Sequence, residues 1–99
     1  MEIAREYIER LKQGKELDYL VNKYVFNGEK PIWKYSSDIT QTKRIIEKYK
    51  ENIVISYLTP MNSFGNSYEW HCNIEGFPSF GNDTMEEAIC KSSLLHCIV

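Results

Sequence analysis

The chain lacks the features of a membrane or exported protein. Its 99 residues contain no apolar run approaching the roughly 20 residues that cross a bilayer. The opening stretch, MEIAREYIERLKQ, has no apolar core of the kind found in signal peptides. The cysteines are three, an odd number, and none belongs to a C-x-x-C pair. Free thiols in a reducing compartment fit this pattern better than a disulfide framework, so we expect a cytoplasmic protein without membrane contact.

An excess of positive charge is also missing. The formal net charge is −2, so the chain has no basic field of the kind that holds nucleic-acid polymers. Hydrophobic residues make up 42% and charged residues 26%, which indicates one folded domain over residues 1–99 with a modest core. Aromatic residues, at 13%, are more than a core of this size must absorb. Some of them are therefore expected to face a ligand or another chain.

The C-terminal stretch NDTMEEAICKSSLLHCIV predicts a helix over 84–97 that has almost no polar side. Thr84 and Glu87 have the T-x-x-E spacing of a capping box. At helical spacing, apolar residues cover nearly the whole circumference and leave a narrow polar strip of Lys91, Ser92 and His96. Such a helix lies between other layers or against a partner subunit. We expect a homo-oligomer, a dimer or higher, that forms through this helix; the competing account is that the N-terminal helix covers its exposed side.

Helical spacing also appears in the first half of the chain. Apolar residues recur through residues 1–13 and again through 15–26, with Gly14 between them, which predicts two short helices or one kinked helix. Pro31 makes the stretch EKPIWKY extended or irregular. A further helix is expected over 38–50, with Ser36 or Ser37 as its cap.

The apolar period changes to two at Asn52. Residues 52–59 and 68–74 predict two antiparallel strands of a hairpin, and FPSF predicts a short third strand. Ile53, Ile55 and Tyr57 fall on one face of the first strand, and its other face is also apolar enough to be covered. The predicted fold class is therefore α+β: a three-layer α-β-α sandwich with an antiparallel sheet of about three strands, in the order ααβββα.

Three pieces of the sequence carry a family resemblance: DYLV at Asp18, WKYSSDI at Trp33 and DTMEEAIC at Asp83. In this order they resemble the signature of the phage ABA-sandwich domain family of small phage and prophage proteins. The resemblance covers about residues 15–99 and leaves the N-terminal helix, residues 1–14, outside. It implies a three-layer domain with one sheet between helices, a phage or prophage gene and hence a host bacterial cytoplasm. It carries over no catalytic residues.

The residues of metal and thiol chemistry are present but poorly arranged. Five possible soft ligands occur in the last thirty residues, namely His71, Cys72, Cys90, His96 and Cys97. Neighbours such as His71 and Cys72 diverge on a strand, and no pair has the C-x₂₋₄-C spacing of structural zinc. Cys72 alternates with large apolar residues and is expected to face the core, away from any substrate. The sequence therefore predicts no metal site, no cofactor, no catalytic residue and no enzyme activity.

A ligand site is easier to place at the start of the middle helix. Acidic residues in the first turn of the C-terminal helix would repel phosphate, whereas the middle helix begins beside serines, lysines and aromatic rings. The candidate ligand-binding residues are Trp33, Lys34, Tyr35, Ser36, Ser37, Lys43 and Phe64. The alternative is that Trp33 and Tyr35 pack under the sheet and the serines only cap the helix. The function expected is a phage-encoded sponge that sequesters a nucleotide-type immune signal of the host; the alternative is a module that binds or inhibits a host protein.

Overall fold

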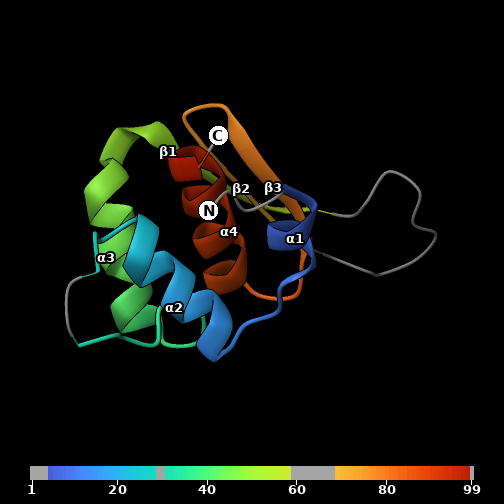
Figure 1. Cartoon of the computed structure of the whole chain (residues 1–99). Helices are drawn as coiled ribbons and strands as arrows, with labels where there is room; N and C mark the ends of the chain where they lie inside the picture. Colours follow the sequence, from blue (N-terminus) through green and yellow to red (C-terminus); the bar gives the residue numbers. More distant parts are fainter. Residues whose placement is uncertain (1–4, 29–30, 59–68, 99) are drawn as a thin grey trace.

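The computed structural model describes residues 5–28, 31–58 and 69–98 (Figure 1). Its elements follow one another as α1 (Arg5–Arg10), α2 (Lys15–Tyr24), α3 (Ile39–Tyr49), a 3₁₀ turn η1 (Lys50–Asn52), β1 (Ile53–Leu58), β2 (Glu69–Ile74), β3 (Phe77–Asn82) and α4 (Met85–Ile98). The α+β class is confirmed, and the N-terminal pattern forms two helices. None of the described helices is long and apolar enough to cross a membrane.

Gly14 separates α1 from α2. Its φ of 153° lies in a region that side-chain-bearing residues rarely adopt, which explains why a glycine stands at this break. The Gly14 carbonyl accepts a hydrogen bond from the Asp18 amide at 3.0 Å, and so begins α2. At the other end, Asn27 and Gly28 both have positive φ, as their sequence predicts, and turn the chain away.

The sheet is antiparallel and open, in the order β1-β2-β3. Opposite residues point to the same face, and the register pairs Ile55 with Cys72 and Tyr57 with Trp70. The predicted hairpin and the predicted facing of both strands are thus confirmed. Glu75 and Gly76, at φ 50° and 88°, form the two-residue turn between β2 and β3, with the positive φ values that match strand twist.

Helix α4 lies between two layers. It packs on β2 and β3 and also contacts α1, α2 and α3. In Figure 1, α2 and α3 lie to the left of α4, and α1 lies to its right, near β3. The helix, and not the sheet, is therefore the inner layer, because it is apolar on both sides. On the opposite face of the sheet, Val54 is 62% exposed, so the prediction that β1 is covered on both faces is wrong for this residue.

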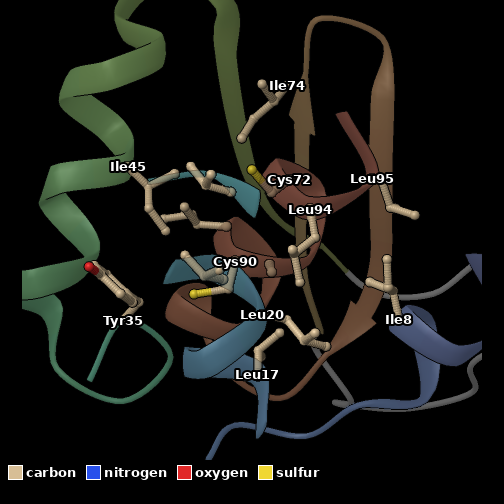
Figure 2. Packing of buried hydrophobic residues seen from close by; sticks show 14 of the residues in the cluster. Ile8, Leu17, Leu20, Tyr35, Ile45, Cys72, Ile74, Cys90, Leu94 and Leu95 are labelled. Atoms are coloured by element: carbon tan, nitrogen blue, oxygen red, sulfur yellow. The ribbon is translucent and has the colours of Figure 1, made fainter. Parts of the chain in front are cut away.

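The core gathers around α4. Figure 2 shows side chains from α2 and α3, such as Leu17 and Ile45, and side chains from the sheet, such as Cys72, converging on Cys90 and Leu94. All the residues from 87 to 95 are buried. Packing within the chain thus accounts for the apolar circumference that motivated the expected oligomer, and α1 covers part of it. A homo-oligomer through α4 stays a prediction that this packing no longer requires.

The polar strip of α4 is buried and not solvated. Lys91 is 3% exposed and Ser92 is fully buried. The Ser92 hydroxyl donates to the Phe77 carbonyl at 2.6 Å and accepts from the Ile74 amide at 2.9 Å. It therefore satisfies backbone groups at the β2–β3 turn, and fixes the sheet on the helix. A polar side chain within the apolar surface of α4 thus forms hydrogen bonds that join the helix to the sheet.

The capping of the helices differs from the sequence-based expectation. The Thr84 hydroxyl accepts the Glu87 amide at 3.2 Å, so one half of the capping box forms. The Glu87 carboxylate, however, accepts from the Gln13 amide at 2.9 Å. The cap of α3 is Asp38, whose carboxylate accepts the Thr40 amide at 2.9 Å, and not one of the serines.

Candidate functional site

The segment between α2 and α3 is anchored by a buried serine. The Asp18 carboxylate accepts both the Ser36 amide at 2.8 Å and the Ser36 hydroxyl at 2.6 Å. The same hydroxyl accepts the Gly14 amide at 2.9 Å. Two pieces of the family resemblance, DYLV and WKYSSDI, thus meet in one hydrogen-bonded contact. Ser36 is fully buried and holds this segment against α2.

Tyr35 has a packing role as well. Its ring is 1% exposed and stacks on Phe26, with 5.0 Å between ring centroids. Its hydroxyl lies 3.4 Å from the Asn22 side-chain oxygen, and its carbonyl accepts the Thr42 hydroxyl at 2.6 Å. Tyr35 is therefore a core residue, as the alternative interpretation expected, and not a ligand contact. It packs with residues of α2 and α3 and with Phe26, however, and not under the sheet.

These anchors leave the preceding residues on the surface. Ile32 and Trp33 are 45% and 39% exposed. The Arg44 guanidinium from α3 lies 5.9 Å from the centre of the Trp33 ring and 5.3 Å from that of Phe26. A cation at this distance from an aromatic ring is attracted to its face, so Arg44 orients the indole while leaving it accessible.

Two hollows of about 400 Å³ each border Trp33. The first, called here the Trp33 pocket, is lined by Lys15, Asp18, Tyr19, Ile32, Trp33 and Lys34. The second is lined by Pro31, Ile32, Trp33, Lys34, Asp38 and Gln41. Rings and an isoleucine supply the apolar wall of the Trp33 pocket, and two lysines supply positive charge. The Asp18 carboxylate in its wall is already engaged by Ser36.

The predicted ligand residues separate into four groups. Trp33 and Lys34 line both hollows. Tyr35 and Ser36 are buried, while Ser37 and Lys43 are exposed and line neither hollow. Phe64 lies outside the described residues.

Sequence reasoning missed four residues of the Trp33 pocket: Lys15, Asp18, Tyr19 and Ile32. Tyr19 carried a usable signal, because it lies off the apolar stripe that Leu17, Leu20 and Val21 form along α2. It is 50% exposed. A large aromatic residue on the polar side of an amphipathic helix indicates a contact surface.

The start of α3 is unsuited to an anion. Asp38 occupies the cap position and places a carboxylate where a phosphate would bind. Lys34 lines the hollow beside this turn, and its carbonyl accepts the Asp38 amide at 2.9 Å. Any anion at this surface would therefore be met by lysine ammonium groups and not by the helix terminus.

The thiols are arranged for packing. Burial raises the pKa of Cys72 to about 12, against a lowering contribution from its hydrogen bond with Ser92. Burial also raises the pKa of Cys90 well above its ordinary value, with nearby acidic groups adding to the effect. Cys97 is exposed, and its sulfur lies 3.4 Å from the Tyr49 hydroxyl. Among the described residues, no group of three His, Cys, Asp or Glu side chains is placed to hold a metal ion.

Comparison with known proteins gives no relative: no family model matches the chain, and neither does any curated protein or solved structure.

Proposed function

We propose that this chain is a non-catalytic binding protein whose ligand occupies the Trp33 pocket. The observation that carries the proposal is the pocket itself, about 400 Å³ in volume, whose lining combines two aromatic rings and an isoleucine with two lysines. Ligand sites commonly have volumes of roughly 300 to 1,000 Å³ and combine apolar walls with a few polar groups. The Cys72 thiol is buried and its pKa is raised, so this cysteine is unsuited to nucleophilic chemistry.

A nucleotide-type ligand has the chemistry that this pocket favours. A base could stack on the exposed rings of Tyr19 or Trp33, and a phosphate could pair with Lys15 or Lys34. The net charge of −2 does not favour a long polyanion, so a small nucleotide suits the molecule better than RNA or DNA.

The motif resemblance to small phage proteins suggests why such a nucleotide would be bound. A phage protein that sequesters a host immune signal needs affinity but no chemistry. Tight binding and a buried, rigid support for the pocket are sufficient for that role. The Asp18–Ser36 contact and the Tyr35–Phe26 stack provide such a support.

A protein partner is the second candidate, and the exposure of the same side chains favours it. Tyr19, Ile32 and Trp33 are adjacent in the Trp33 pocket and 50%, 45% and 39% exposed. Tryptophan and tyrosine are enriched among the residues that contribute most to protein–protein affinity. A host protein could therefore dock on the same surface.

Thermal shift assays with linear and cyclic nucleotides test the first candidate. A nucleotide at 100 times its Kd is expected to stabilise the fold by about 2.7 kcal/mol and so to raise Tm. Trp33→Ala is expected to weaken its binding by about 5- to 150-fold in titration calorimetry, because a base–aromatic stack contributes about 1–3 kcal/mol. Tyr7→Ala is the matched control, since Tyr7 is an exposed aromatic outside the pocket.

The outcomes separate the two candidates. An unchanged Kd in Trp33→Ala would place the ligand elsewhere and contradict the site. If no nucleotide raises Tm, the nucleotide proposal fails. A purified host protein that binds the chain, and loses affinity with Trp33→Ala but not with Tyr7→Ala, would then support the second candidate.

A further inference from the structure

The two edges of the sheet are protected to different degrees. The β3 edge contains Pro78, which has no amide hydrogen, and its pairing with β2 shifts register between Trp70 and Cys72. Both features discourage a further strand from pairing with a sheet edge. The β1 edge, IVISYL, has no proline, no glycine and no charged residue, and all six of its residues pair with β2 without a shift. It is a straight, neutral edge.

The same strand exposes two large apolar side chains. Val54 and Tyr57, at 62% and 54%, are the most exposed large hydrophobic residues in the described part of the chain. Val54 lies on the face away from α4. Tyr57 lies on the other face, where its ring stacks on Trp70 with 4.5 Å between centroids. An unprotected edge that exposes apolar side chains on both of its faces is typical of a surface that pairs with another chain.

We propose that the β1 strands of two copies of this chain pair antiparallel about a two-fold axis, and so form a continuous six-stranded sheet. Because side chains alternate with period two, the axis must pass through a residue position if each face is to continue across the contact. An axis at Ile55 sets Tyr57 opposite Ile53 of the second copy and Val54 opposite Ser56. The pair of Tyr57 and Ile53 is an aromatic with a β-branched residue, which is favourable across strands.

Two features favour a second copy over an unrelated strand. A neutral strand meets no like charge when it pairs with itself across an axis. The dimer also closes, because pairing consumes both β1 edges and leaves the two β3 edges, with Pro78, at the outer ends. This contact lies on the sheet, away from the α4 residues that the chain already buries and from the Trp33 pocket. It is therefore independent of the proposed function.

The strength of the contact follows from its size. One strand pair with its side chains is smaller than the roughly 1,600 Å² of a standard stable interface, so we expect dissociation in the micromolar range. Sedimentation velocity over a micromolar concentration series is expected to show the mass rise from 11.7 kDa towards twice that value. A wild-type chain that stays monomeric throughout the series overturns the proposal.

Charge substitutions at Val54 locate the contact. Val54→Lys and Val54→Glu each place two like charges near the axis, and are expected to raise the dissociation constant by tenfold or more. Val54 is largely exposed, so the fold is expected to survive, which circular dichroism checks. An equimolar mixture of the two variants is expected to regain the dimer, because opposite charges then meet. Tyr7→Lys, on the exposed surface of α1, is the control and is expected to dimerise as the wild type does.

Two results would overturn the location. One is a dimer that persists in both Val54 variants, and the other is a mixture that does not recover. Hydrogen exchange of the wild type gives a readout that needs no variant. The β1 amides that point away from β2 are expected to gain protection as concentration rises; protection independent of concentration contradicts the pairing.

Discussion

At the scale of single residues, the buried ion pair of Glu87 and Lys91 explains how the N-terminal segment is fixed. The two side chains are 2% and 4% exposed, with 3.4 Å between the lysine nitrogen and a carboxylate oxygen. Glu87 also accepts the Gln13 amide at 2.9 Å, and Lys91 donates to the Glu9 carbonyl at 3.1 Å. These hydrogen bonds offset part of the desolvation of the two charges. The pair thereby determines where the α1–α2 connection lies on α4.

Removing one member of this pair is expected to be costly. Glu87→Ala leaves the Lys91 charge buried without its partner, and we expect a loss of about 3–5 kcal/mol in the free energy of unfolding. Glu86→Ala, one residue earlier and partly exposed, is the control and is expected to cost less than about 1 kcal/mol. Urea melts followed by circular dichroism measure both. Equal losses in the two variants would mean that the carboxylate of Glu87 is not the important group.

At the scale of elements, the sequence was informative wherever the signal was local. The helix expected over 84–97 is Met85–Ile98, and the strands expected over 52–59 and 68–74 are Ile53–Leu58 and Glu69–Ile74. Periodicity determines such elements through neighbours in the chain. The layer that each element joins depends instead on distant residues. Lys91 was predicted only to belong to a narrow polar strip, and its burial did not follow from the local pattern because one of its partners, the carbonyl of Glu9, is 82 residues away.

The candidate site shows the same difference between what local sequence patterns predict and what contacts between distant residues determine. Trp33 and Lys34 were predicted and do border the hollows. Ser36 was assigned to a cap or a ligand because it precedes a helix, whereas its actual partner is Asp18 on α2. Tyr19 and Ile32 were missed because their role depends on how the segment after α2 folds back beside them. The local sequence pattern indicates which residues are candidates for ligand binding. Contacts between distant parts of the chain determine which of these side chains remain accessible to a ligand.

Helix α4 is the element whose packing can be tested most directly. Leu94 is fully buried between the sheet and the other helices, so Leu94→Ala is expected to lower the free energy of unfolding by about 2–5 kcal/mol. Ile39→Ala removes an apolar side chain that is 38% exposed at the start of α3, and we expect a clearly smaller loss. Denaturant titration compares them. A Leu94→Ala loss no greater than that of Ile39→Ala would contradict the inner position of α4.

At the scale of the whole molecule, the buried groups with raised pKa values predict sensitivity to alkali. Cys72 has an ordinary pKa of 9.0 and a folded pKa of about 12, because burial disfavours its thiolate; burial also raises the pKa of Tyr49. Between pH 9 and pH 12 the unfolded Cys72 has released its proton while the folded one retains it. The unfolded state then binds fewer protons, so the stability present below pH 9 falls as pH rises towards 12.

Urea melts at a series of pH values from neutral to alkaline measure this fall. Cys72→Ala removes one of the contributing groups, so its stability is expected to decline less steeply with pH than that of the wild type. Tyr19→Phe is the control, because Tyr19 is a half-exposed residue of α2. A wild-type stability that is level or rising across this interval would contradict the burial of these groups.

The inner position of α4 also has a kinetic consequence. The sheet and the α1–α3 helices contact each other mainly through α4, so neither layer has its apolar partner until that helix docks. Docking joins residues far apart in the chain, as the contact of Gln13 with Glu87 over 74 positions illustrates. Closing so long a loop has an entropic cost that is incurred before its contacts form. We therefore expect one cooperative folding transition, with a rate limited by this chain closure and not by the formation of any single helix.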